Sequence, residues 1–140
     1  MRVELSVHAA KLKNVAGAFK GTSDPFAVCT MMPAAPGEKP RVLGKTEVIK
    51  NNLNPQWVTS FELDYEMGTP CKVAINIFDE IRKGDNKSMG SAVFDIGEVL
   101  GESRVEELCP AAVDSLVVRT EKKCSLLWLD CFFIFIRCPW

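Results

Sequence analysis

The chain has 140 residues, of which 47% are hydrophobic and 25% charged, a composition typical of one globular domain with a hydrophobic core. A formal net charge of −1 argues against a general nucleic-acid-binding protein. The charge is uneven, because residues 1–60 hold eight Lys and Arg against four Asp and Glu. The first sixty residues are therefore the part expected to meet an anionic partner.

Site chemistry typical of enzymes is missing from the sequence. The chain has one His, no Gly-x-Ser-x-Gly, no phosphate-binding loop and no Cys beside the His, so we do not expect an enzyme. Its six Cys include no Cys-x-x-Cys pair, which argues against a structural zinc site. Met1 and Arg2 lead directly into an alternating pattern instead of a secretion signal. We therefore expect a cytoplasmic protein with reduced thiols.

Alternating apolar and polar residues, separated by Gly- and Pro-containing turns, predict short strands along most of the chain. In chain order, these strands are expected over residues 2–9, 25–32, 41–50, 57–63, 73–77 and 89–99. No helical stretch is expected. Short strands at this spacing indicate a single antiparallel sandwich domain over residues 1–140.

The pattern weakens after residue 102. One more strand is expected from Leu116–Arg119 or from Leu126–Ile136. The second stretch is almost wholly apolar, but it is shorter than the about 20 residues that a membrane-spanning helix needs. A buried strand, a tail that dips into a membrane and a disordered apolar end all remain open for it.

Four short motifs carry a family resemblance when they are taken in order. They are Ser23-Asp24-Pro25-Phe26, Asn54-Pro55-Gln56-Trp57, Phe78-Asp79 and Met89-Gly90. Over about residues 2–101 the chain resembles a C2 domain, and from Gly44 to Gly90 it also looks like the amino-terminal C2 domains of copines. The resemblance implies an all-β fold, an eight-stranded antiparallel Greek-key β-sandwich. Its topology would be circularly shifted, with the amino-terminal strand first and the last strand supplied by the poorly matched residues 103–140.

The resemblance also raises the question of a calcium site. Calcium-binding C2 domains use five acidic residues from two loops, since Ca²⁺ takes about six to eight oxygen ligands. Here Asp24 and Asp79 match two of these positions, and Ala18, Ile81 and Lys87 stand at the other three. The candidate calcium ligands are Asp24, Asp79, Asp85 and Asn51. The alternative for Asp24 and Asp79 is a structural role, in which they cap a turn and end a strand.

Basic residues suggest the second way in which such a domain binds. Lys39, Arg41 and Lys45 share one parity, so they project from the same side if the third strand is regular, and Lys50 lies at its far end. Val15 and Phe19 in the first loop are candidates for membrane contact. We therefore expect peripheral binding to anionic phospholipid with weak or no calcium dependence. The alternative is a protein-interaction domain that does not bind lipid.

Overall fold

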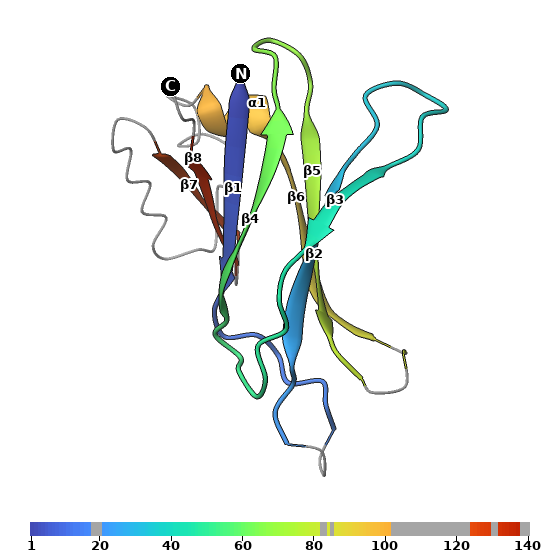
Figure 1. The fold of residues 1–140 in the computed structure, drawn as a ribbon, viewed down its shortest axis with the longest axis vertical. Coiled ribbons are helices and arrows are strands. Elements are labelled where there is room, and N and C mark those ends of the chain that lie inside the picture. Colours follow the sequence, from blue (N-terminus) through green and yellow to red (C-terminus); the bar gives the residue numbers. More distant parts are fainter. Residues whose placement is uncertain (18–20, 82–83, 85, 102–123, 130–131, 138–140) are drawn as a thin grey trace, which may run out of the picture.

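The computed structural model describes residues 1–17, 21–81, 84, 86–101, 124–129 and 132–137. These residues form two antiparallel four-stranded sheets, with the strand orders β4-β1-β8-β7 and β3-β2-β5-β6 (Figure 1). The elements are β1 (Arg2–Ala9), β2 (Pro25–Met31), β3 (Arg41–Lys45), β4 (Gln56–Asp64), β5 (Lys72–Asp79), β6 (Lys87–Asp95), α1 (Ile96–Leu100), β7 (Cys124–Leu129) and β8 (Phe132–Arg137). The predicted antiparallel β-sandwich is confirmed.

The core lies between the two sheets and follows the alternation seen in the sequence. Val3, Leu5 and Val7 of β1 are fully buried, as are the alternate residues Val73, Ile75 and Ile77 of β5. Successive side chains of a strand point to opposite faces, so each strand contributes every second residue to the core. Each such side chain stabilises the fold by about 1.5–3 kcal/mol relative to leaving it exposed.

Trp57 connects the two sheets close to the start of β2. Its side chain is 2% exposed, and its indole Nε1 donates a hydrogen bond of 3.3 Å to the carbonyl oxygen of Pro25. A buried indole N–H needs such a partner. The hydrogen bond from Trp57 holds Pro25 at the start of β2. Because Pro25 follows Asp24 directly, the packing of Trp57 in the core also helps to position the candidate site residue Asp24.

The third strand is shorter and less regular than predicted. It ends at Lys45, after which the side-chain oxygen of Thr46 accepts the Ala27 N–H at 2.9 Å. The pairing with β2 is also interrupted, because Gly44 lies opposite Cys29 but Val42 lies opposite Thr30. Leu43 is therefore the extra residue of a β-bulge. Residues before and after Leu43 that would share a face in a regular strand consequently point to opposite faces of the sheet.

The sixth strand gives way to a helical turn where the sequence predicted a strand as far as Val99. The Asp95 side chain accepts the Gly97 N–H at 2.8 Å and so caps α1. Gly97 also lies tightly against Tyr65, since a Cβ atom at this position would lie 2.6 Å from the Tyr65 hydroxyl. The predictions of strand up to Val99 and of no helix were wrong because Asp95 acts as a cap.

The carboxyl-terminal part of the chain contributes to the sheet that contains β1. There β8 pairs with β1 and β7 pairs with β8, both antiparallel. The predicted strand over Leu126–Ile136 is thus divided between two strands, and Asp130 falls between them. The other predicted strand, Leu116–Arg119, lies outside the described residues. Among the residues that are described, no helix is long and apolar enough to cross a bilayer.

Glu47, in the connection after β3, bonds to the backbone of β4. Its carboxylate accepts the N–H groups of Val58 at 2.6 Å and Thr59 at 3.3 Å, together with the Thr59 hydroxyl. Partial burial by itself raises the pKa of Glu47, but the hydrogen bonds from Thr59 and Val58 outweigh it and hold the pKa below its ordinary value. The two sheets are thereby joined along the edge where β3 and β4 lie.

This lowered pKa predicts a pH-dependent stability. Glu47 stabilises the folded chain above its ordinary pKa of 4.5, and this contribution is lost as the pH falls through the lower pKa of the folded state. We expect the difference in unfolding free energy between the natural chain and Glu47→Gln to be largest near neutral pH and to shrink in acid. Urea denaturation at a series of pH values measures it. A difference that stays constant across the series would contradict the assignment.

Candidate functional site

Three connections meet at the end of the sandwich opposite the amino terminus. They are residues 10–24 between β1 and β2, residues 46–55 between β3 and β4, and residues 80–86 between β5 and β6 (lower part of Figure 1). The sequence-predicted residues Asp24, Asn51 and Asp79 lie in these connections or at the strand ends beside them. The structure therefore brings three of the four candidate calcium ligands to one end, and Asp85 lies outside the described residues.

The first connection is closed by a buried serine. Ser23 is fully buried, and its hydroxyl accepts the N–H groups of Val15 at 2.9 Å and Ala16 at 3.2 Å. The same hydroxyl donates to the side chain of Asn14 at 2.9 Å. Short polar side chains that bond to nearby backbone stabilise such turns. Val15 is thus held by its backbone and is half-buried, whereas Phe19 lies outside the described residues.

Asp24 and Asp79 form a chain of hydrogen bonds through the three connections. The Asp79 carboxylate, 3% exposed, accepts the Asp24 N–H at 2.7 Å, and the Asp24 carboxylate accepts the Asn51 N–H at 2.7 Å. The Glu80 N–H in turn donates to the Asp24 carbonyl oxygen at 3.0 Å. Hydrogen bonds to a charged carboxylate are about twice as strong as those between neutral groups. The two carboxylates therefore act as structural acceptors for backbone amides.

Asn51 contributes its backbone to this network. It has a φ of 52°, in the left-handed region that Asn tolerates better than most residues, and this conformation directs its N–H to Asp24. A Cβ atom on Gly21 would lie 3.6 Å from the Asn51 side-chain oxygen, which places that oxygen beside the first connection. Among the described residues, no group of three or more His, Cys, Asp or Glu is placed to hold a metal ion.

Lys87 bridges the first and third connections. Its ammonium group donates to the carbonyl oxygen of Val15 at 3.3 Å, although the two residues are 72 positions apart in sequence. The sequence motif identified Lys87 only as a cation at a position where calcium-binding C2 domains have a carboxylate. Its bond to Val15 is a tertiary contact, which no local sequence pattern could have indicated.

The basic residues of β3 do not form one face. Lys45 lies opposite Val28, and its ammonium group is 5.9 Å from the centre of the Phe26 ring on the outer side of the sheet. Arg41 lies opposite Met31 and lines cavities near the start of the strand. The prediction that the two project from the same side was wrong, because the bulge at Leu43 reverses the alternation between them.

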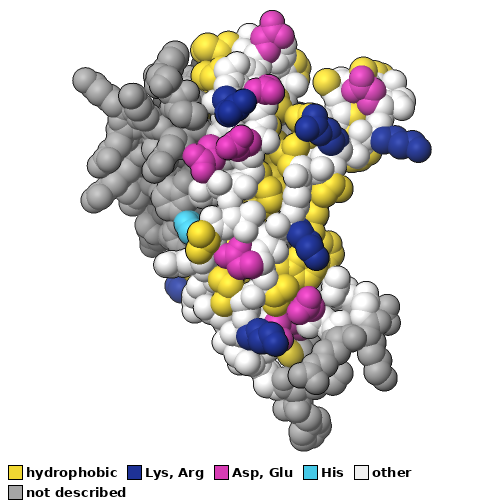
Figure 2. All heavy atoms as spheres, viewed as in Figure 1, with side chains coloured by type: hydrophobic (Ala, Val, Ile, Leu, Met, Phe, Trp, Pro, Cys, Tyr) yellow, Lys and Arg dark blue, Asp and Glu magenta, His cyan; other side chains and the backbone are white. Residues whose placement is uncertain are grey.

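Lys50 and Lys39 also lie far apart. Lys50 is exposed and precedes Asn51, at the end where the three connections meet. Lys39 is exposed in the connection between β2 and β3, towards the opposite end, and lines a cavity with Arg41. On the face drawn in Figure 2, cationic side chains are spaced along the molecule with acidic side chains between them. Lys45 and Lys50 are therefore the pair from the predicted basic set that lies near the three connections.

A C2 domain profile matches residues 1–110. The chain belongs to the C2 domain family. C2 domains are membrane- or protein-binding modules and typically non-catalytic. The motifs at Asp24, Trp57, Asp79 and Gly90 predicted this membership correctly.

Two curated proteins are similar to this C2 domain. Synaptotagmin-4 of Arabidopsis thaliana is 26% identical over 121 residues, covering 86% of the chain and 20% of the relative. The E3 ubiquitin-protein ligase RSP5 of Chaetomium thermophilum is 34% identical over 102 residues, covering 71% of the chain and 11% of the relative. The chain thus spans a fifth or less of the length of these relatives.

Solved structures show the same fold at lower identity. A C2 domain of plant Extended Synaptotagmin 1 has a TM-score of 0.57 and 18% identity, and the alignment covers 96% of this chain and 91% of that domain. Human GIVD cytosolic phospholipase A2 has a TM-score of 0.65 and 16% identity over 97% of this chain. That alignment covers only 16% of the phospholipase chain. These likenesses concern the fold.

Proposed function

We propose that this C2 domain is a non-catalytic module that binds peripherally to anionic phospholipid membranes on the cytoplasmic side. The observation that carries the proposal is the position of Lys45, whose ammonium group lies over the Phe26 ring on an outer sheet face. Phe26 follows the Asp24-Pro25 pair, so this cation lies near the three connections, as does Lys50. Val15 and Phe19 of the first connection remain the proposed membrane contacts.

The contact between Lys45 and Phe26 favours an interfacial role. A cation held over an aromatic face is partly oriented without an acidic partner, so it stays available to a phosphate. Phe26 also packs against Phe78, with ring centroids 5.7 Å apart. Near an anionic membrane each such cation contributes about 1 kcal/mol. Two cations with apolar contact from a loop give the weak, salt-sensitive affinity of a peripheral module.

We propose that binding depends weakly or not at all on calcium. The supporting observation is that the Asp24 and Asp79 carboxylates already accept backbone N–H groups, while Lys87 places a cation between the first and third connections. A calcium ion would compete with these hydrogen bonds and meet the positive charge of Lys87. Asp85 and Asn51 remain the candidates that would have to complete a site if calcium binds.

Co-sedimentation with phosphatidylserine liposomes tests the lipid proposal. Lys45→Glu replaces one attraction by one repulsion, so we expect binding to weaken by about 2 kcal/mol, or about 30-fold. Arg41→Glu is the matched control, because it makes the same charge change on the same strand at the other end of the sandwich. We expect that control to bind like the natural chain.

Three outcomes would overturn parts of this assignment. Equal loss for Lys45→Glu and Arg41→Glu would mean that net charge alone drives binding, without a defined face. Binding that requires added Ca²⁺ would mean that Asp24, Asp79 and Asp85 form a working site. Failure to bind liposomes under any condition would favour the alternative proposal, a protein-interaction domain that does not contact lipid.

A further inference from the structure

A cavity of about 440 Å³ lies near the end of the sandwich that is away from the three connections. Its wall is largely apolar and is formed by the end of β2, the connection that follows it and the residues before β5. The apolar lining residues are Met31, Met32, Pro33, Ala34, Pro70 and Cys71. Its volume lies within the range of about 300–1,000 Å³ that small-molecule pockets occupy. It has room for an apolar side chain and the groups around it.

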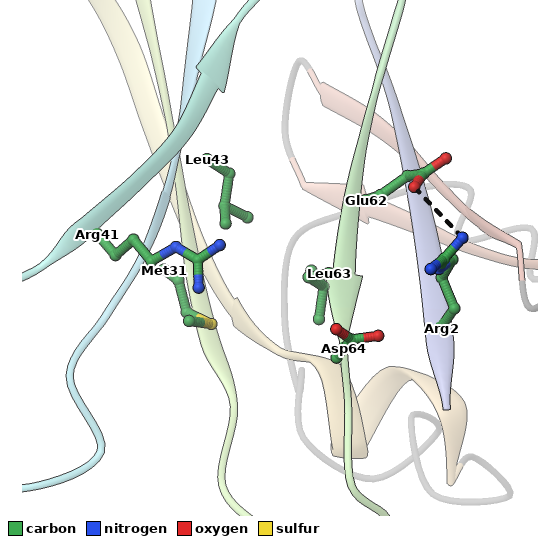
Figure 3. A pocket seen from close by; sticks show the side chains of 7 residues that line it. All are labelled: Arg2, Met31, Arg41, Leu43, Glu62, Leu63 and Asp64. Carbon is green, nitrogen blue, oxygen red and sulfur yellow. Dashed lines mark ion pairs between the residues drawn. The ribbon is translucent and has the colours of Figure 1, made fainter.

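Arg41 stands at the junction of this cavity and a second one. The second cavity, of about 210 Å³, lies between β3 and β4, and Met31 and Arg41 line both. In Figure 3 the Arg41 side chain extends from β3 towards β4, alongside Met31 and Leu43. Arg2 and Glu62, across the cavity, pair with each other at 3.9 Å. Within the described part of the chain, Arg41 has no ion-pair partner.

The charges around Arg41 restrict what can bind. The larger cavity is lined by Lys39 and Arg41 against one acid, Glu38, so it has one excess positive charge. On the opposite wall of the smaller cavity, Glu62 and Asp64 repel any further anion. A carboxylate can therefore approach Arg41 from the larger cavity, where Lys39 adds positive charge, and not from the side of Glu62 and Asp64. A single carboxylate matches the one excess positive charge, whereas a phosphate cluster or an acidic stretch does not. Arginine binds a carboxylate through two parallel hydrogen bonds, which makes it the residue suited to this recognition.

We propose that these cavities form a peptide-binding site for a partner protein. This site is distinct from the lipid face, which is the surface around Lys45, Lys50 and the three connections. The site takes a segment in which one carboxylate stands beside an apolar side chain. The carboxylate pairs with Arg41, and the apolar side chain enters the cavity between the methionines and prolines. Methionine adapts to the shape of bound side chains and is common at peptide-binding surfaces. The site lies away from the three connections, so a membrane-bound domain keeps it exposed to the partner.

Methionine methyl groups offer a direct probe of this site. The chain has five Met, of which Met31 and Met32 line the cavity, while Met67 and Met89 do not. With [methyl-13C]methionine, the chemical shifts of all five can be followed during titration with acetyl-Gly-Leu-Glu-Gly-amide. We expect a saturable shift of Met31 and Met32 at millimolar peptide, without a change at Met67 and Met89. The same peptide with Gln for Glu, or with Gly for Leu, should bind at least about tenfold more weakly.

Variants separate this site from the lipid face. Arg41→Glu should abolish the shifts of Met31 and Met32 and leave liposome binding intact, and Lys45→Glu should do the reverse. Absence of shifts at the cavity methionines, or shifts that persist in Arg41→Glu, would overturn the peptide site. That result would leave the lipid proposal untouched, because its test depends on Lys45. Loss of both activities in Arg41→Glu would contradict the assignment of two separate sites.

Discussion

Replacement of Trp57 by Ala is expected to lower the free energy of unfolding by about 3–5 kcal/mol. Trp57 is 2% exposed and is among the largest fully buried side chains of the described core. Its removal loses the burial of an aromatic side chain and leaves a cavity between the sheets, which the surrounding strands fill only in part. The Pro25 carbonyl oxygen also loses its hydrogen bond from the indole. Urea denaturation followed by far-ultraviolet circular dichroism measures the effect.

Trp57→Phe is the control that separates packing from hydrogen bonding. Phe retains an aromatic ring but has no N–H, so we expect a smaller loss than for Ala. Hydrogen exchange at the amides of Ser23, Asp24 and Phe26 should still increase in this variant, because the start of β2 loses its bond to β4. If Trp57→Ala unfolds at the same urea concentration as the natural chain, Trp57 is not the core contact described above.

The second large effect concerns Asp79. Asp79→Ala removes a buried acceptor and leaves the Asp24 N–H without its partner, so we expect a loss of about 2–3 kcal/mol in unfolding free energy. Asp79→Asn keeps an acceptor oxygen of the same shape and should lose clearly less. Thermal denaturation of the three proteins, each with and without Ca²⁺, measures both the structural role and any metal role.

The measurements with and without Ca²⁺ distinguish a structural role of Asp79 from a metal-binding role. A ligand that binds only the folded chain raises the free energy of unfolding. Once the ligand concentration exceeds the dissociation constant, this increase grows with the logarithm of the ligand concentration. A structural role for Asp79 predicts equal losses in the variant with and without Ca²⁺. If Ca²⁺ stabilises the natural chain and not Asp79→Ala, then Asp79 is a metal ligand, and the weak calcium dependence proposed above is wrong.

Local pattern was sufficient to predict much of the sandwich. The alternation in β1 and β5 and the turns at Asp24-Pro25 and Asn54-Pro55 each depend on residues that are close in sequence, and they predicted strands that the structure contains. The cap formed by Asp95 is also local, but its signal was masked by the apolar residues Ile96 and Val99, which fit a strand equally well. Their burial comes from the helical turn instead.

The arrangement of the candidate site was harder to predict, because it depends on register and on contacts between distant residues. One extra residue at Leu43 separates Arg41 from Lys45. The neighbouring Gly44 is a local signal for a bulge, but it does not show which residue is the extra one. The contact between Lys87 and Val15 and the bonds from Glu47 to β4 likewise join separate segments. The sequence supplied the candidate site residues, but it could not assign the partners of their side chains.

Glu47 has a consequence for how copies of this chain behave towards one another. β4 is an edge strand, and unpaired N–H groups on such an edge are a template for pairing with another chain. The Glu47 carboxylate occupies the N–H groups of Val58 and Thr59, next to the 91% exposed side chain of Val58. Protonation in acid weakens these hydrogen bonds and frees the two N–H groups for pairing with another chain. The same carboxylate that supports the fold thus protects concentrated protein against edge-to-edge aggregation.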